Sequence, residues 1–147
     1  MYPHEHNRTG HGAGILLARP QGRVLLLRRS QQINNPGRWN LPGGGVDPGE
    51  DPYDAAFREF AEEAGSIPPG RIESVYTLHK TRKGRDRTYT TVAVRLGDPN
   101  WQPHINWESD ALCWITPRAA LYAHEAGELR LHHLTRDILR WWRDASE

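Results

Sequence analysis

The chain has 147 residues, the size of one domain, and its 37% hydrophobic and 25% charged residues exclude intrinsic disorder. A formal net charge of +1 excludes a global electrostatic attraction to nucleic acid or to a membrane. The single cysteine, Cys113, excludes an internal disulfide and fits a reducing compartment.

The N-terminal residues carry no visible targeting segment. The first apolar run, residues 15–18, is too short for a signal peptide or a transmembrane helix. We therefore expect a cytoplasmic protein without membrane contacts. A polar, mobile tail is expected over residues 1–12, and a single domain accounts for residues 1–147.

The predicted secondary structure begins with a β-hairpin over residues 13–29, whose turn lies at residues 20–22. The continuous apolar run at residues 24–27 indicates a strand covered on both faces, which requires helices packed on the sheet. Residues 30–49 are predicted to be loops. The remaining expected elements are a helix at 52–64, strands at 72–79 and 88–96 joined by a charged loop, a strand at 111–115, and helices at 117–123 and 129–144. Interleaved strands and helices predict an α/β or α+β class with a mixed sheet.

Three carboxylates share one face of the first predicted helix. Glu59, Glu62 and Glu63 lie at positions i, i+3 and i+4, where like charges repel by about 0.2–0.5 kcal/mol per pair. They also sit near the C-terminal end of the helix, where the helix dipole disfavours negative charge. Acidic residues are common on exposed helices, so this placement alone leaves a solvated surface open. Clustered carboxylates are also the hard oxygen ligands that suit Mg²⁺ or Mn²⁺.

The residues around this helix favour the metal-site interpretation. A run of glycines at residues 43–45 lets backbone carbonyls approach a ligand closely. Arg58 precedes the acidic set, and Glu50 lies eight residues before it, at the junction of loop and helix. An ion pair between these two side chains would clamp the loop onto the helix.

Read as one pattern, this stretch is Gly44, five residues, Glu50, seven residues, and then Arg58-Glu59-Phe60-Ala61-Glu62-Glu63-Ala64-Gly65-Ser66. It resembles the Nudix box of the Nudix hydrolase family, in its MutT-like form, over residues 44–66. Every polar and glycine position matches, and Ser66 departs from the aliphatic residue that usually closes the box. Residues 39–44 are similar to the lead-in common in the family. Glu108, followed by Trp114, is similar to an arrangement in MutT-like members.

The resemblance implies an α/β/α sandwich with a mixed sheet between helices, and a Mg²⁺- or Mn²⁺-dependent pyrophosphohydrolase that cleaves a nucleoside diphosphate linked to another group. Glu59, Glu62, Glu63 and Glu108 would be metal ligands, together with the Gly43 carbonyl. Either Glu59 or Glu108 would be the general base, with Arg58 orienting the site. Many members form dimers, so the resemblance also implies a possible homodimer.

The expected substrate is a nucleoside triphosphate or a nucleotide sugar. The basic segment at residues 79–87 makes Arg82, Lys83 and Arg85 candidates for contacts with phosphates or an RNA 5′ end, although hairpin tips are often merely charged. By resemblance, Arg29 is a candidate phosphate contact. Tyr89 is a candidate for stacking on a base, although strand aromatics are often core residues.

Two alternatives remain from the sequence. An RNA 5′-pyrophosphohydrolase is favoured by the basic segment. A catalytically silent Nudix domain that senses a nucleotide is disfavoured, because such domains typically lose box glutamates that this chain keeps.

Overall fold

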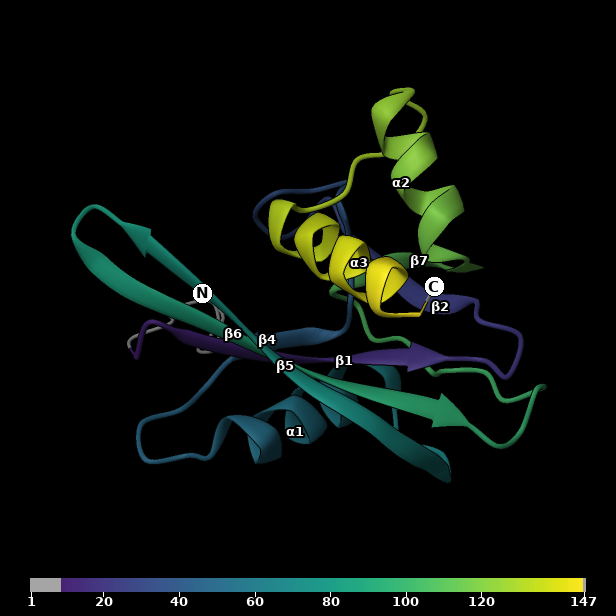
Figure 1. Cartoon of the computed structure of the whole chain (residues 1–147), viewed down its shortest axis with the longest axis horizontal. Coiled ribbons are helices and arrows are strands. Elements are labelled where there is room, and N and C mark those ends of the chain that lie inside the picture. The colour runs from purple at the N-terminus through teal and green to yellow at the C-terminus, as the bar shows by residue number, and fades with distance from the viewer. Residues whose placement is uncertain (1–8, 147) are drawn as a thin grey trace.

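The computed structural model describes residues 9–146, apart from the side chain of Arg82. One mixed β-sheet lies between helices on its two faces, so the expected α/β sandwich is confirmed (Figure 1). None of the helices in this part of the chain is long and apolar enough to cross a membrane. In chain order the elements are β1 (His11–Ala18), β2 (Val24–Arg29), β3 (Trp39–Asn40), β4 (Gly43–Gly45), α1 (Pro52–Ala64), β5 (Gly70–Arg82), β6 (Arg85–Leu96), β7 (Ser109–Ile115), α2 (Pro117–Glu125) and α3 (His133–Ala145).

The sheet is built around β1. The main path runs β3-β2-β1-β6-β5, while β4 pairs with β1 and β7 pairs with β2. Strands β1 and β6 are parallel from His11↔Thr88 to Ala18↔Arg95, and the other pairings are antiparallel. The sheet is therefore mixed, and its central strand carries the short glycine strand β4 along one edge.

Two hydrophobic cores lie on opposite faces of the sheet, because successive residues of β1 point to opposite sides. Ile15 and Leu17 pack in the core that includes Phe60 of α1. Leu16 and Ala18 pack in the core beneath α2 and α3, with residues such as Leu139. The helices α2 and α3 thus cover one face and α1 the other, as Figure 1 shows.

Several predicted boundaries are wrong. His11 and Gly12 pair within the sheet as part of β1, so they do not belong to the predicted tail. Residues 1–8 lie outside the described residues. The predicted loops at 30–49 contain the short strands β3 and β4. Helix α3 begins at His133 and not at residue 129, because the His132 side chain caps it by accepting a hydrogen bond from the Leu134 N–H at 3.2 Å.

The charged loop predicted between the fifth and sixth strands is also wrong. Strands β5 and β6 continue through it and pair from His79↔Thr88 to Arg82↔Arg85, leaving a turn of only Lys83 and Gly84. Both turn residues have positive φ, at 53° and 74°, which is the backbone of a tight two-residue hairpin. Pairing of β1 with β6 begins at Thr88, so the segment beyond it extends past the neighbouring strand (Figure 1). Residues 79–88 are called the arm below.

Candidate active site

Helix α1 is fixed at both ends by local chemistry. The Asp51 carboxylate caps its N-terminus by accepting from the Tyr53 N–H at 2.7 Å, and Pro52 occupies the first turn, where its missing N–H costs nothing. Gly65 ends the helix with a φ of 86°, a conformation that other residues rarely adopt. The three box glutamates are thereby held in the last two turns.

Arg58 joins this helix to the preceding loop. Its Nε donates to Glu50 Oε2 at 2.8 Å and its Nη2 to Glu50 Oε1 at 2.9 Å, so the expected ion pair is confirmed as a bidentate one. The same guanidinium donates to the Gly45 carbonyl at 3.0 Å, to Glu59 at 3.0 Å and to Glu62 at 3.2 Å. The arrangement lowers the pKa of Glu50 chiefly through the Arg58 hydrogen bond, and it raises the pKa of Arg58 chiefly through Glu50. We call Arg58 and these partners the Arg58 clamp.

Glu59 lies beneath the glycine strand β4. Its side chain is fully buried, and a Cβ added to Gly44 would lie 2.5 Å from Glu59 Oε2. A side chain at position 44 would therefore displace this buried carboxylate. Glu62, in contrast, is 44% exposed and points along the helix surface toward Arg58.

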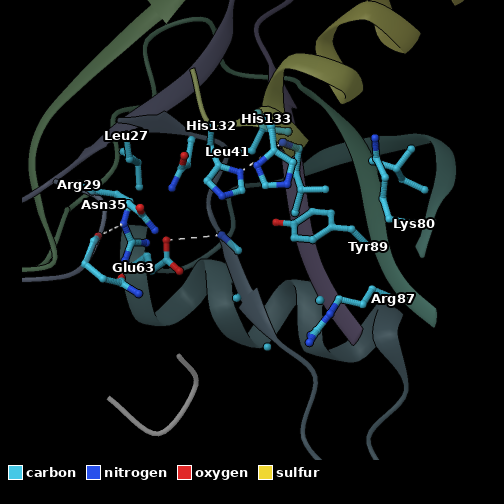
Figure 2. A pocket seen from close by; sticks show the side chains of 18 of the residues that line it. Leu27, Arg29, Asn35, Leu41, Glu63, Lys80, Arg87, Tyr89, His132 and His133 are labelled. Atoms are coloured by element: carbon cyan, nitrogen blue, oxygen red, sulfur yellow. Dashed lines mark hydrogen bonds between the residues drawn. The ribbon is translucent and has the colours of Figure 1, made fainter. Parts of the chain in front are cut away.

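Glu63 and Glu108 form the acidic end of the site. The Gly43 N–H donates to Glu63 Oε2 at 3.4 Å, as the dashed line in Figure 2 shows. Desolvation raises the pKa of Glu63 well above its usual range, and the charges of Glu59 and Glu108 add to this, while the Gly43 hydrogen bond and Arg29 oppose it. Three carboxylates thus act on one another here, in a place where water cannot screen them fully.

Asn106 holds Glu108 against the end of α1. Its backbone N–H donates to the Glu63 carbonyl at 3.2 Å and its Nδ2 to the Glu62 carbonyl at 2.9 Å. The same Nδ2 donates to Glu108 Oε1 at 3.3 Å, and the Glu108 N–H donates to Asn106 Oδ1 at 3.0 Å. The sequence did not indicate a role for Asn106, because nothing in its local pattern shows that it donates to the last carbonyls of α1.

A cavity of about 460 Å³ opens beside these carboxylates (Figure 2). Five predicted site residues line it: Gly43, Glu63, Glu108, Arg29 and Tyr89. The Tyr89 hydroxyl packs over Gly14 and Gly43, and burial raises the pKa of this phenol. The other predicted residues, which do not line the cavity, are Arg58, Glu59, Glu62, Lys83 and Arg85, and the Arg82 side chain is not described.

The opposite end of the cavity contains residues that sequence reasoning did not single out. His132 and His133 meet there with ring centroids 4.3 Å apart, above the Tyr89 ring in Figure 2. Burial lowers the pKa of His132 to about 4, so this ring is neutral at pH 7 and its Nδ1 accepts the Leu134 hydrogen bond. Lys80 and Arg87 complete this end. Both belong to the basic segment noted in the sequence, which was the one available signal.

The donor set fits a divalent cation by its chemistry. Glu59, Glu63 and Glu108 offer only hard oxygens, and their mutual repulsion is the kind that a cation relieves. Within residues 9–146, however, no three acidic, histidine or cysteine side chains already form a metal cage. Arg58 holds Glu59 and Glu62 instead, so loading a cation requires these two carboxylates to share or leave the Arg58 clamp.

Residues 8–141 match the NUDIX domain family. The chain belongs to that family. It is a Nudix hydrolase that acts on pyrophosphate bonds, and the resemblance found in the box is thereby confirmed. Nudix hydrolases generally depend on a divalent metal.

Similar proteins differ in the substrates that their names give. An RNA pyrophosphohydrolase of Caulobacter vibrioides is 34% identical to this Nudix hydrolase over 143 residues, covering 95% of this chain and 74% of that protein. Human diphosphoinositol polyphosphate phosphohydrolase 3-beta is 37% identical over 84 residues, covering 56% of this chain and 49% of that protein. Among solved structures, a C. elegans Ap4A hydrolase has a TM-score of 0.70 at 26% identity, covering 91% of this chain and 95% of that one. The Nudix hydrolase RenU of M. smegmatis has a TM-score of 0.72 at 28% identity, covering 92% and 84%.

Proposed function

We propose that this Nudix hydrolase is Mg²⁺-dependent and hydrolyses the 5′-triphosphate end of an RNA. The observation that carries the proposal is the lining of the cavity. The Glu63 and Glu108 carboxylates lie at one end, and two cations, Lys80 and Arg87, lie at the other. A terminal triphosphate would occupy the acidic end with its metal, and the rest of the substrate would extend toward the cations. The name of the Caulobacter relative supports this choice over the other pyrophosphates.

Glu59, Glu63 and Glu108 would hold the metal, with the Gly43 carbonyl as a further donor. Glu62 would contribute indirectly, because it accepts a hydrogen bond from the same Arg58 nitrogen that donates to Glu59. A bound Mg²⁺ supplies neutralisation of the pyrophosphate charge and activation of water. Arg29 lies close enough to Glu63 to influence its pKa, so it is placed to orient a phosphate beside the carboxylates.

Between the two candidate bases, the structure favours Glu108. Glu59 is fully buried under β4 and hydrogen-bonded to Arg58, whereas Glu108 lines the cavity. A base must reach the water whose proton it takes, directly or through one further water. Asn106 would then act as a positioning residue, because its Nδ2 donates to Glu108 Oε1 and so orients this carboxylate.

Free nucleotides are the competing substrates. The neutral His132 ring and the Tyr89 ring at the cavity's far end could stack on a planar base. They suit the base of a single nucleotide as well as the first base of an RNA. A catalytically silent, nucleotide-sensing domain is disfavoured, because this chain keeps every box glutamate and the Arg58 clamp that orders them.

The test is release of phosphate or pyrophosphate with Mg²⁺ from a 5′-triphosphorylated oligonucleotide, a nucleoside triphosphate, a nucleotide sugar and a diphosphoinositol polyphosphate. We expect the highest kcat/KM on the oligonucleotide, and we expect Glu63→Gln to lower this activity about 10²- to 10⁴-fold. A higher kcat/KM on a mononucleotide would return the substrate to the class expected from the sequence. Binding of nucleotides without turnover of any of them would support the sensing domain instead.

A further inference from the structure

We infer that one face of the arm is a binding track for the phosphate backbone of the RNA beyond its 5′ end, so that this hydrolase selects its substrate by chain length. The inference rests on the proposed function and adds a second contact region outside the cavity. Its partner is a single-stranded polyanion that leaves the cavity along β5 and β6.

The register of the arm places like charges directly opposite one another. Lys80 pairs with Arg87 across the two strands, and Arg82 pairs with Arg85 one step nearer the turn. Directly opposed like charges normally destabilise a hairpin. One acidic residue, Asp86, lies between Arg85 and Arg87 on β6, and its carboxylate accepts a hydrogen bond from the Thr81 hydroxyl at 3.3 Å. The arm therefore carries a positive charge that it does not neutralise with its own residues.

These cations continue the wall of the cavity outward. Leu78 and Tyr89 are cross-strand partners that line the cavity, and Lys80 and Arg87 are the next pair on the same face. Because side chains alternate along a strand, Arg85 belongs on the face that carries Arg87. Successive pairs lie about 6.7 Å apart along the strands. The face thus passes from an aromatic and apolar pair to a basic pair and then to a second basic position.

The cations on this face differ in how they are held. Lys80 forms an ion pair with Asp137 of α3 at 2.9 Å, which ties the arm to the helix beside the cavity. Arg87 is half-buried at the cavity wall, and its side chain makes no hydrogen bond or ion pair within residues 9–146 (Figure 2). Arg85 is exposed and likewise has no such partner among the described residues. A half-buried guanidinium without an anion is placed to bind one.

A small substrate would not use the whole face. Lys80 and Arg87 lie at the cavity wall, where the phosphates of a mononucleotide or of an inositol polyphosphate would reach them. Arg85 does not line the cavity, so a ligand must continue out of the cavity to contact it. The net charge of the whole chain is only +1, so attraction of such a ligand depends on this local face and not on the global field.

The experiment measures kcat/KM on 5′-triphosphorylated RNAs of one to six nucleotides, for the intact protein and for the double variant Arg82→Gln/Arg85→Gln. We expect kcat/KM to rise over the first few nucleotides and then to level off. In the double variant the ratio of the hexanucleotide kcat/KM to the mononucleotide kcat/KM should fall about tenfold. The salt dependence of hexanucleotide binding should weaken by about 1.4 in log–log slope, since each phosphate contact on a single strand contributes about 0.7.

The matched control is Arg71→Gln, which removes a cation from the other end of β5, where Arg71 is exposed and bonded to Glu73 at 3.0 Å. This variant should keep the length preference and the salt slope of the intact protein. The double variant should keep its melting temperature, because it removes repulsion and no described contact. A double variant that lost both its length preference and its folded structure would contradict the inference.

Binding of a fluorescent 5′-monophosphorylated hexanucleotide, followed by anisotropy, separates this inference from the proposed function. If no triphosphorylated RNA is hydrolysed, the proposed function fails, while weaker hexanucleotide binding by the double variant still supports the track. If RNA is hydrolysed equally well at every length and the double variant binds as the intact protein does, the track fails alone. A higher kcat/KM on a diphosphoinositol polyphosphate that depends on Lys80 and Arg87 but not on Arg85 would overturn the polynucleotide as partner.

Discussion

The Arg58 clamp and the arm are two charged regions that manage their charges in opposite ways. In the clamp, one guanidinium contacts Glu50, Glu59, Glu62 and the Gly45 carbonyl, so opposite charges are satisfied inside the protein. In the arm, Lys80 faces Arg87, so like charges meet across the strands. The first region is organised to hold its own shape. In the second, Asp137 pairs with Lys80, and we propose that RNA supplies the anions for Arg85 and Arg87.

The largest expected effect separates catalysis from stability at the acidic end. Glu63→Gln should lower kcat about 10²- to 10⁴-fold, the range for removing a catalytic carboxylate. Its melting temperature at pH 7.5 should stay the same or rise, because the raised pKa of Glu63 means that its charge is unfavourable in the folded state. Kinetics and thermal unfolding of the same preparation measure both.

The matched control for this variant is Glu73→Gln on β5. Arg95 lowers the pKa of Glu73, so this carboxylate stabilises the fold when charged. Glu73→Gln should lower the stability modestly, by about 0.2–1 kcal/mol, and leave kcat unchanged. Equal losses of activity in both variants would contradict the assignment of Glu63.

Breaking the Arg58 clamp should affect both properties together. Arg58→Gln leaves the fully buried Glu59 without its guanidinium partner, and removing one member of a buried pair costs about 3–5 kcal/mol. We expect a lower denaturant midpoint and a lower kcat, since the same change releases β4 from α1. Asp47→Asn is the control, because the Asp47 carboxylate is 63% exposed and its Oδ2 lies 3.6 Å from Arg58 Nη2, farther than the other partners of Arg58. A stable Arg58→Gln protein would show that β4 and packing alone hold the loop.

The stability of the protein should depend on pH through His132, which lines the cavity between the Arg58 clamp and the arm. Burial, His133, Arg38 and Arg29 lower the pKa of His132 from 6.5 to about 4 in the folded protein. The unfolded chain therefore binds more protons between these values, so the His132 contribution is complete above about pH 6.5 and is lost as the pH falls toward 4. Protonation of Nδ1 also removes the cap on α3.

His132→Asn keeps a capping side chain but not the titration. Urea unfolding between pH 4 and 7.5 should give a shallower loss of stability on acidification than the intact protein, with a difference of about 1 kcal/mol or less at neutral pH. His124→Asn serves as the comparison, because His124 lies in α2 away from the cavity and accepts from the Leu131 N–H at 3.1 Å. Identical pH profiles for the intact protein and His132→Asn would refute the assigned protonation state.

The smallest expected effect has opposite signs for stability and function. Arg87→Glu replaces the Lys80–Arg87 repulsion by an attractive cross-strand pair, worth about 0.2–1 kcal/mol. The melting temperature should rise slightly while kcat/KM on triphosphorylated RNA falls. Val75→Thr, at an exposed position of the paired strand β5 outside the cavity lining, is a control for changes in the strands themselves. A fall in both quantities would mean that Arg87 is a structural residue.

The clamp was predictable from the sequence because its partners lie close together in the chain. Glu50, just before α1, and Arg58, within it, are eight residues apart, and the glycines lie a few residues earlier in the chain. Helical spacing then places Glu59 and Glu63 without any knowledge of the sheet. The mixed-sheet class followed from interleaved strands and helices, whereas the sandwich was implied by the resemblance to the Nudix family.

The arm and the far end of the cavity were not predictable in this way. The pairing of Lys80 with Arg87 depends on a two-residue turn at Lys83 and Gly84, and a shift by one residue would move every arm side chain to the other face. Lysine is an unusual residue at positive φ, so the turn gave a weak signal. His132 and Tyr89 line the same cavity although more than forty residues separate them in the chain, so no local pattern relates them.

The position of β5 gives the arm a second consequence. Strand β5 ends the main sheet path, so within the described residues its outer backbone edge has no strand beside it over 13 residues. Ile72 and Val75 on this strand are 47% and 51% exposed, and bare apolar edges invite pairing with other chains. The lysine and arginines toward the tip repel a second copy of the same edge. The charges that we propose to attract RNA should therefore also oppose edge-to-edge pairing, and a protein with a fully neutralised arm should aggregate at lower concentrations than the intact protein.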